Sequence, residues 1–297
     1  KPLPRRKLTE KVPLLDCFTA PCEGGCPIRQ DIPEYIELCR TGRYTEALTL
    51  ITEKNPLPFT TGTICAHRCQ TKCTRNYYDE SVHIRETKLV AAENGYDALM
   101  RSLKKPAPVT DGRKAAIIGG GPTGIAAAYF LGRAGIPVTV FERSSRLGGV
   151  PMQVIPGFRI SEAAIEKDIA LMQFYGAEIR LNTPAPSVAE LNVAGYTHIF
   201  FAVGAGKAGR LNIPGNVVPV IQWLRDLKAG KKVSLGHVAV IGGGNTAMDA
   251  ARAAIRSGAA SATLVYRRTK RYMPADAEEL EVNRRSRSAK LRVLEKV

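Results

Sequence analysis

Two short apolar runs, each followed at once by a glycine-rich loop, constrain the fold of this chain more than any other feature. The run Ala115–Ile118 leads into Gly119, Gly121 and Gly124, which fit the pattern G-x-G-x-x-G. In such a loop the first glycine allows a tight turn, the second lets a diphosphate approach the backbone, and the third packs helix against strand. The diphosphate then lies against unpaired N–H groups at the start of the helix. We therefore predict a dinucleotide-binding βαβ unit here.

The residues that follow complete this first unit. A second strand is predicted at Val138–Phe141, and Glu142 follows it, eighteen residues after Gly124. A carboxylate at this place can accept a hydrogen bond from the ribose hydroxyls of adenosine. The next residues, Arg143 to Gly149, resemble the segment that lies along the FAD in flavoproteins with two dinucleotide-binding domains. This resemblance favours FAD over NAD at the first site.

The second glycine loop follows the apolar run Val238–Ile241. Its pattern is G-x-G-x-x-A, formed by Gly242, Gly244 and Ala247. The two apolar runs head similar βαβ units, so the chain contains an approximate internal duplication of a nucleotide-binding unit.

The second unit lacks the acidic residue of the first. The strand predicted at Ala262–Tyr266 is followed by Arg267 and Arg268. A carboxylate here would repel the 2′-phosphate of NADP, whereas guanidinium groups can bind it bidentately. An arginine pair alone would indicate only a solvated strand end. Its place after a complete βαβ unit favours NADP over NAD.

Six of the seven cysteines form two triplets near the amino terminus. They are Cys17, Cys22 and Cys26, with four and three residues between them, and Cys65, Cys69 and Cys73, with three and three. Neither triplet contains the C-x-x-C of zinc fingers and thioredoxins, and the bacterial ferredoxin spacing is also absent. Compact triplets can still converge on an iron–sulfur cluster, which we favour; structural zinc and reduced buried cysteines are the alternatives. Cys39 lies on the apolar face of a predicted helix and reads as core packing.

The overall composition limits the partners. The 297 residues include 43 Lys and Arg against 27 Asp and Glu, a net charge of +16. Such a charge favours polyanions, but the basic residues are scattered and no nucleic-acid-binding motif accompanies them, so we do not predict a nucleic-acid partner. No apolar stretch approaches the ~20 residues that span a bilayer, and no secretory segment is evident. We predict no membrane association and a cytoplasmic location.

The predicted fold class is α/β, with three domains. Residues 1–104 form a helical cysteine-rich domain, with amphipathic helices expected at Ile32–Cys39 and Tyr44–Ile51. A Pro-rich linker follows at 104–112. Residues 113–235 and 236–297 form the FAD-binding and NADPH-binding Rossmann-like domains.

Several further motifs resemble one protein family. They are Cys22-Glu-Gly-Gly-Cys26-Pro-Ile, Asp31-Ile-Pro-Glu-Tyr-Ile, Gly42-Arg-Tyr-Thr-Glu-Ala-Leu, Asn55-Pro-Leu-Pro, the two glycine loops, and Tyr266-Arg-Arg-Thr with Met273-Pro274. The family comprises the glutamate synthase small subunit and the amino-terminal half of dihydropyrimidine dehydrogenase. The chain also resembles a subgroup of large iron–sulfur flavoproteins grouped under the name selenate reductase.

The resemblance implies a full set of cofactor-binding residues. FAD would be held by Gly119, Gly121, Pro122, Gly124, Glu142, Arg143, Leu147, Gly148, Gly149 and Gly204. NADPH would be held by Gly242, Gly244, Asn245, Thr246, Ala247, Asp249, Arg267 and Arg268. One or two [4Fe–4S] clusters are implied, one bound by Cys17, Cys22 and Cys73 and the other by Cys26, Cys65 and Cys69.

The sequence departs from this family at three places. Leu14 stands where the family has a further cysteine, and Lys88 stands where it has a Glu or Gln ligand. Neither Leu nor protonated Lys can ligate iron, so each cluster would have three thiolates; a labile or three-iron cluster, an outside ligand or an empty site could result. The Gly-Asp segment that closes the family's FAD domain has no counterpart before Val297, and the third domain is short. We therefore expect the carboxy-terminal part of the two-domain flavoprotein fold to be incomplete.

These observations predict an NADPH-dependent oxidoreductase. Electrons would pass from NADPH through FAD and iron–sulfur clusters to an electron-accepting domain or subunit, and no side chain is predicted to act as a catalytic acid or base. The alternative is a non-catalytic scaffold or binding module with vestigial cofactor sites, a hypothesis that the substitutions at Leu14 and Lys88 favour.

Overall fold

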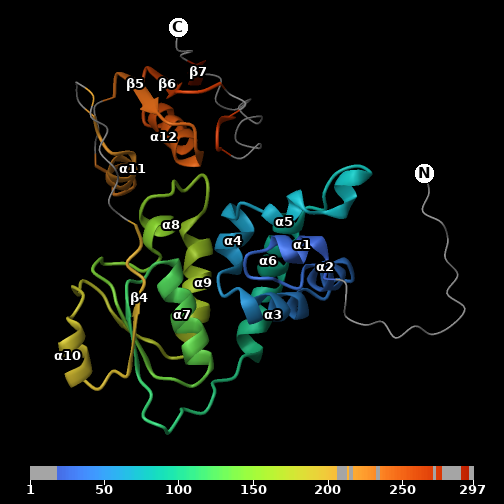
Figure 1. The fold of residues 1–297 in the computed structure, drawn as a ribbon, viewed down its shortest axis with the longest axis vertical. Coiled ribbons are helices and arrows are strands. Elements are labelled where there is room, and N and C mark those ends of the chain that lie inside the picture. The colour runs from blue at the N-terminus through green and yellow to red at the C-terminus, as the bar shows by residue number, and fades with distance from the viewer. Residues whose placement is uncertain are drawn as a thin grey trace, which may run out of the picture.

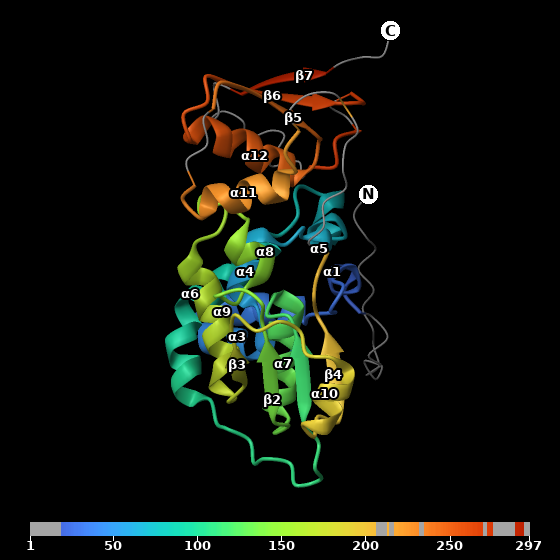
Figure 2. The same cartoon turned by 90° about the vertical axis from the view of Figure 1, so that its left-hand side faces the viewer.

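The structure is a computed structural model that describes residues 19–205, 213, 217–231, 235–269, 272–275 and 289–293. The predicted ligand Cys17 and the position of Leu14 lie outside these residues. A helical layer packs beside a first α/β unit, and a second α/β unit lies at one end of the first (Figures 1 and 2). Within the described residues, no helix combines the length and the apolar character that crossing a membrane requires.

The helical layer contains short helices around one long one. Its elements are α1 (Pro21–Gly25), α2 (Ile32–Arg40), α3 (Tyr44–Lys54), α4 (Pro58–Ile64), α5 (Arg68–Thr71), the 3-10 helix Thr74–Tyr77 and α6 (Ile84–Ser102). Proline stands in the first turn of α1, α2 and α4, where its missing N–H costs nothing. The apolar spacing that predicted α2 buries Ile32, Tyr35 and Leu38. Both helices expected from the sequence are therefore present.

The first α/β unit is a parallel sheet with the strand order β3-β2-β1-β4. Its strands are β1 (Ala115–Ile118), β2 (Val138–Phe141), β3 (Glu178–Arg180) and β4 (His198–Phe201), joined by α7 (Pro122–Arg133), α8 (Gly149–Gln153), α9 (Glu162–Phe174) and α10 (Val188–Val193). β1 is buried along its whole length, as its four apolar residues predict. The chain winds to opposite sides of β1 toward β2 and β4, so ligands are expected at the carboxyl ends of β1 and β4.

The second α/β unit repeats the first on a smaller scale. Its elements are α11 (Val220–Lys228), β5 (His237–Ile241), α12 (Asn245–Arg256), β6 (Ser261–Tyr266) and β7 (Ala289–Val293), and the parallel strands lie in the order β5-β6-β7. The two strands and the glycine loop predicted here are all present. The internal duplication read from the sequence is thus a duplication of structure.

The helical layer and the first α/β unit share one hydrophobic core. Leu48, Phe59 and Leu99 from the helices belong to the same buried cluster as Ile117 and Tyr129 from the α/β unit. Burying apolar surface stabilises each part by roughly 25 cal/mol per Å² removed from water. Because the two parts share this core, the helical layer, which carries the cysteines, is packed firmly against the first α/β unit.

A buried carboxylate adds a specific link between these two parts. Asp168 on α9 is fully buried, and its carboxylate accepts hydrogen bonds from the backbone N–H groups of Phe59 (3.0 Å) and Thr60 (2.7 Å) in the first turn of α4. Those N–H groups have no partner inside the helix, and the helix dipole favours an anion there. Asp168 thus caps α4 across the junction.

Replacing Asp168 with Ala is expected to destabilise the protein by about 2–4 kcal/mol, because two buried N–H groups lose their acceptor. The loss should appear as a lower Tm, whereas Glu166→Gln, an exposed change on the same helix, should leave Tm almost unchanged. Equal effects of the two substitutions would argue against the capping role.

Asp168 also predicts a pH dependence. Burial raises its pKa to about 7, against the hydrogen bonds from Thr60 and Phe59. Between the ordinary pKa of about 3.9 and this value, the folded state keeps a proton that the unfolded state has lost, so this group's contribution to stability falls as the pH rises from about 4 to 7. Asp168→Asn removes that titration. The Tm of this variant relative to the parent should therefore rise over the same interval, and a pH-independent difference would contradict the assignment.

The second α/β unit is attached through α8 and the loop after it. The Lys228 ammonium on α11 donates to the carbonyl oxygens of Pro151 (3.4 Å) and Ile155 (2.8 Å). Val154, which follows α8, is buried in the core of the second unit. These contacts place α11 directly over α8, at the edge of the first glycine loop.

Candidate functional site

The first glycine loop is packed so closely at Gly119 and Gly124 that a larger residue cannot replace either glycine without movement of the backbone. A Cβ on Gly124 would lie 1.9 Å from the carbonyl oxygen of Gly119, and one on Gly119 would lie 2.5 Å from that of Ala202. Gly119 also has a φ of +108°, which favours glycine. The loop therefore brings the start of α7 against the end of β4, where Gly204 follows.

The segment after β2 folds back onto this loop. The Gly148 N–H donates to the Gly120 carbonyl (2.8 Å), and a Cβ on Gly149 would lie 2.8 Å from the Cα of Gly121. Leu147 is buried beneath Gly120. The segment thus lies against the glycine loop, and its role along the FAD stays a prediction.

Glu142 organises the same place. One of its carboxylate oxygens accepts from the Gly120 N–H (2.6 Å), and the other accepts from the N–H (2.8 Å) and hydroxyl (2.7 Å) of Ser144. Each carboxylate oxygen can accept more than one bond. The side chain therefore fixes the loop and still lines the cavity that a ribose would enter.

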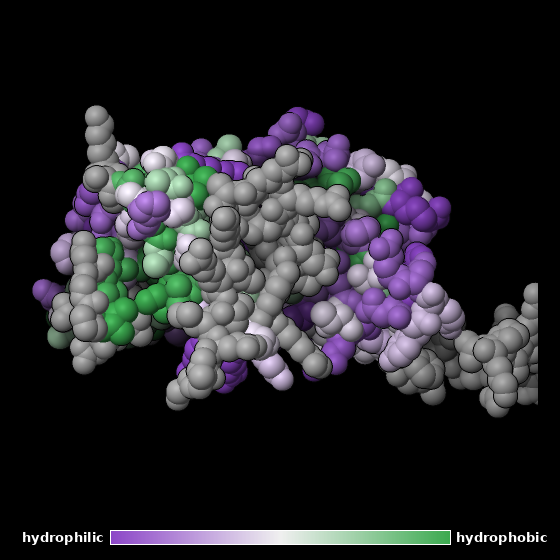
Figure 3. Space-filling model, turned by 90° about the horizontal axis from the view of Figure 1, so that it is seen from above, coloured by the Kyte–Doolittle hydropathy of each residue, from purple (hydrophilic) through white to green (hydrophobic). Residues whose placement is uncertain are grey.

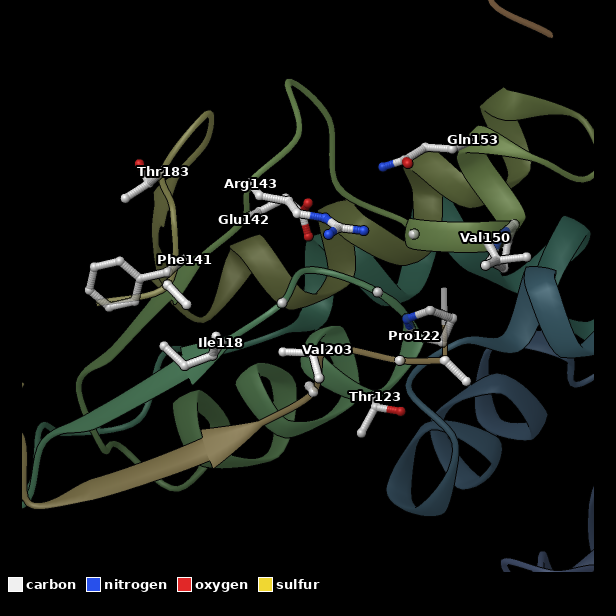
Figure 4. A pocket seen from close by; sticks show the side chains of 18 of the residues that line it. Ile118, Pro122, Thr123, Phe141, Glu142, Arg143, Val150, Gln153, Thr183 and Val203 are labelled. Carbon is white, nitrogen blue, oxygen red and sulfur yellow. The ribbon is translucent and has the colours of Figure 1, made fainter. Parts of the chain in front are cut away.

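A cavity of about 560 Å³ lies over the carboxyl ends of β1, β2 and β4. Of the residues predicted to bind FAD, it is lined by Gly119, Gly121, Pro122, Glu142, Arg143, Gly149 and Gly204. Gly124, Leu147 and Gly148 do not line it and instead shape the loops around it. Figure 4 shows the Arg143 side chain extending from the end of β2 toward α8, where Gln153 stands on the far side of the cavity.

The cavity wall includes residues that the sequence analysis missed. Asn182 and Thr183 follow β3, and the Thr183 N–H donates to the carbonyl of Glu142 (3.0 Å). The rule that ligands gather at the carboxyl ends of parallel strands could have indicated this pair. Gln153 on α8 and Arg225 on α11 also line the wall, and no sequence signal marked either.

Arg225 is contributed by the second α/β unit. Among the described residues its buried Nε has no hydrogen-bond partner, and its Nη1 makes one long contact to the Oε1 of Gln222 (3.4 Å). A guanidinium group that lines a cavity could form charge-assisted hydrogen bonds with a diphosphate bound there.

We expect Arg225→Gln to raise the Kd for FAD by about 10–100-fold, the loss of one charge-assisted bond worth about 1.5–3 kcal/mol. Flavin fluorescence titration of the apoprotein measures this. Lys231→Gln serves as the control, since Lys231 is exposed and pairs with Asp226 (2.6 Å). An unchanged Kd in the Arg225 variant would remove this residue from the flavin site.

The second glycine loop is covered by an aromatic ring. Gly242 has a φ of +148°, and Gly244 precedes α12, whose first residues are Asn245, Thr246 and Ala247. A Cβ on Gly243 would lie 2.7 Å from the ring of Tyr266. The start of α12 therefore faces the carboxyl ends of β5 and β6, as a nucleotide site requires.

The other residues predicted to bind NADPH divide into two groups. Arg267 and Arg268 are exposed at the carboxyl end of β6, beside this loop. Asp249 is buried on α12 and pairs with Arg159 of the first unit at 3.3 Å. The structure therefore places Asp249 at the joint between the two units.

The cysteines lie in the helical layer around α1 and α5. Those described are unpaired; Cys69 and Cys73 are buried, and Cys22, Cys26, Cys39 and Cys65 are half-buried. A Cβ on Gly25 would lie 2.9 Å from the Lys72 side chain, so α1 and α5 approach closely. Within the described residues, no three His, Cys, Asp or Glu side chains are grouped as ligands of a single metal ion.

Electrostatic interactions link Cys69 to Cys65 and Cys26, and Cys22 to Cys73. Burial, together with the neighbouring Cys65 and Cys26, raises the pKa of Cys69 to about 11. Burial also raises the pKa of Cys22, which couples to Cys73. The family resemblance implies the same grouping as cluster ligands, with Cys17 outside the described residues, and that assignment stays a prediction. Because the donors are soft thiolates, they fit iron–sulfur ligation.

Two glycine-loop βαβ units beside a thiol-rich helical layer define a dinucleotide-dependent redox protein. Residues 113–293 match the profile of the pyridine nucleotide-disulphide oxidoreductases, so the chain belongs to that family. Residues 7–98 match the profile described as dihydropyrimidine dehydrogenase domain II, 4Fe-4S cluster. These matches confirm the predicted fold class, and they confirm the predicted cofactors, FAD, NADPH and a [4Fe–4S] cluster, at the level of the family.

Comparisons with individual proteins agree. The Escherichia coli (strain K12) protein YgfK is 45% identical over 287 residues, covering 95% of this chain and 28% of that protein. The NADPH glutamate synthase small chain of the same strain is 31% identical over 291 residues, covering 90% of this chain and 61% of that one. A 2-naphthoyl-CoA reductase structure matches in fold with a TM-score of 0.52 and 24% identity, covering 63% of this chain and 29% of that one. The chain thus spans less than two thirds of each of these relatives.

Proposed function

We propose that this chain is the electron-input part of an NADPH-oxidising iron–sulfur flavoprotein. The observation that carries this proposal is the cavity at the carboxyl ends of β1, β2 and β4, whose wall includes Arg225 of the second α/β unit. The first α/β unit, which forms most of this cavity, shares a hydrophobic core with the helical layer that carries the thiols, and its Val154 is buried in the core of the second unit. When bound, NADPH and FAD would supply hydride-transfer chemistry, and the iron–sulfur clusters would supply one-electron transfer.

The chain's own residues bind and orient these groups. The start of α7 and Arg143 would hold the FAD diphosphate, and Glu142 would accept from the ribose hydroxyls. In the second unit the start of α12 would hold the NADPH diphosphate, with Arg267 and Arg268 on the 2′-phosphate.

The thiols would form two ligand sets. Cys26, Cys65 and Cys69 would bind one cluster, and Cys22 and Cys73 would bind the other together with Cys17, which lies outside the described residues. The shared core with the first unit supports a fixed distance between thiols and flavin.

The recipient of the electrons would be another domain or a protein subunit. The relative named as a small chain supports this proposal, since that name implies a larger partner. We also propose a cytoplasmic location, because the clustered cysteines that the structure describes are free thiols, which suits a reducing compartment.

The arginine pair provides the test of coenzyme use. Replacing both Arg267 and Arg268 with Ala should lower the preference for NADPH over NADH by about 10–100-fold, as expected for losing one or two charge-assisted bonds to the 2′-phosphate. Stopped-flow reduction of the bound flavin by each coenzyme measures the preference. A parent protein that prefers NADH, or a variant whose preference is unchanged, would overturn this assignment.

A further inference from the structure

Lys88 is an unusual charge in the interior of the helical layer. It lies on the face of α6 that also presents Ile84 and Ala91 inward, and only 5% of it is exposed. Ile84 and Ala91 belong to the same buried cluster as Cys69, and Cys26 packs against that cluster. An ammonium group in apolar surroundings is costly unless anionic groups face it.

The groups whose charges act on Lys88 are mainly the thiols of one predicted ligand set. Burial lowers the pKa of Lys88, whereas Cys65, Cys69 and Cys26 act in the opposite direction, and Arg85 acts with burial. The interaction also affects the thiol: Lys88 lowers the pKa of Cys69, in opposition to burial, which raises it. Asp168 also interacts with Lys88, but its carboxylate already accepts two bonds from α4.

We propose that Lys88 is the fourth group of the Cys26, Cys65 and Cys69 site and acts there through its positive charge, raising the reduction potential of the cluster that these thiolates hold. The inference rests on the proposed ligand set. A protonated lysine has three N–H donors and no lone pair, so it can donate to sulfur but cannot ligate iron. It is therefore a positioning and tuning residue, not a ligand.

The physical reason is the charge of the reduced cluster. Reduction adds one electron to the cluster, and net charge, hydrogen bonds to sulfur and solvent exposure set its potential. A fixed positive charge stabilises the more negative state, and the effect is larger where solvent is excluded. Lys88 is buried, and the start of its helix is joined to the segment that carries Cys65 and Cys69 by the Arg85 N–H, which donates to Gln70 Oε1 (3.3 Å), and by the contact of Arg85 Nη1 with His67 Nδ1 (3.1 Å).

The test is a reductive titration of the full chain with dithionite, followed by electron paramagnetic resonance of the clusters and by flavin absorbance. Four proteins are compared: the parent, Lys88→Gln, Lys88→Arg and Lys72→Gln. Gln is close to Lys in size but uncharged, Arg keeps the charge, and Lys72 is exposed on the loop between Cys69 and Cys73, where solvent screens it.

We expect one cluster potential to fall in Lys88→Gln, while the second cluster and the flavin keep theirs. Lys88→Arg and Lys72→Gln should both match the parent. Unchanged potentials in Lys88→Gln, at unchanged iron content, would overturn the role of Lys88 and leave the proposed ligand set standing.

Two further outcomes distinguish a failure of the proposed ligand set from a failure of the proposed role of Lys88. A parent protein purified anaerobically without iron would overturn the ligand set, and the inference with it. If Lys88→Gln loses iron, the Arg variant decides: iron retained at the parent potential supports the charge requirement, and a shifted potential or lost iron in the Arg variant contradicts it.

Discussion

Replacing Gly124 with Ala is expected to abolish stable flavin binding, with the Kd for FAD rising by at least about 100-fold, or ~3 kcal/mol. The added Cβ would lie 1.9 Å from the Gly119 carbonyl oxygen and 3.2 Å from the Ile117 side chain. Because the obstacle is backbone, the loop must move, and the N–H groups at the start of α7 move with it.

Gly157→Ala is the matched control for this prediction. Nothing lies within 4 Å of a Cβ on Gly157. This variant should keep the parent's flavin content and Tm, and circular dichroism should show that the Gly124 variant retains its secondary structure. A Gly124→Ala protein that purifies with full flavin would show that the first glycine loop does not hold the diphosphate.

Replacing Cys69 with Ala should remove about half of the iron and sulfide if two clusters are present, because a cluster left with two thiolates is poorly retained. Cys69 is buried and couples to Cys65 and Cys26, its proposed partners. Iron and sulfide assays on anaerobically purified protein measure the loss.

Cys39→Ala provides the control on the same domain. Cys39 is half-buried on α2, and its thiol lies 3.9 Å from the Thr87 carbonyl oxygen. It belongs to neither proposed ligand set, so this variant should keep the parent's iron. Equal losses in the two variants would mean that iron retention reflects general stability of the layer, and no loss in either would exclude Cys69 as a ligand.

Much of the nucleotide-binding architecture could be predicted from local pattern. Four buried residues at Ala115–Ile118 followed by the spaced glycines specify a strand, a turn and a helix within one short segment. The same holds for the second unit, where β5 and β6 differ from the predicted strands by one residue at their starts. Such signals need no information from distant parts of the chain.

The contacts that join the units could not be predicted in this way. Asp168 meets Phe59 and Thr60 across more than a hundred residues, and Arg225 reaches the first cavity from the second unit. Asp249 shows the same limit: its motif predicts cofactor binding, which stays a prediction, and gave no sign of the pairing with Arg159. Which charged group faces which partner depends on how preformed units pack, and periodicity carries no record of that packing.

The thiols are an intermediate case. Their clustering was visible in the sequence, and the family resemblance divided them into two sets. The coupling of Cys69 to Cys65 and Cys26, and of Cys22 to Cys73, arises only when α1 and α5 come together. Lys88 was visible as a departure from the family, but its burial on α6 was not.

An anaerobic ultraviolet–visible spectrum of the purified chain, taken with iron and sulfide assays before and after NADPH is added, tests the central claim most directly. We predict a flavin spectrum with a broad iron–sulfur shoulder, iron and sulfide in similar amounts, and bleaching when NADPH is added. A colourless protein without iron, whose spectrum NADPH leaves unchanged, would contradict the account and favour a scaffold with vestigial cofactor sites.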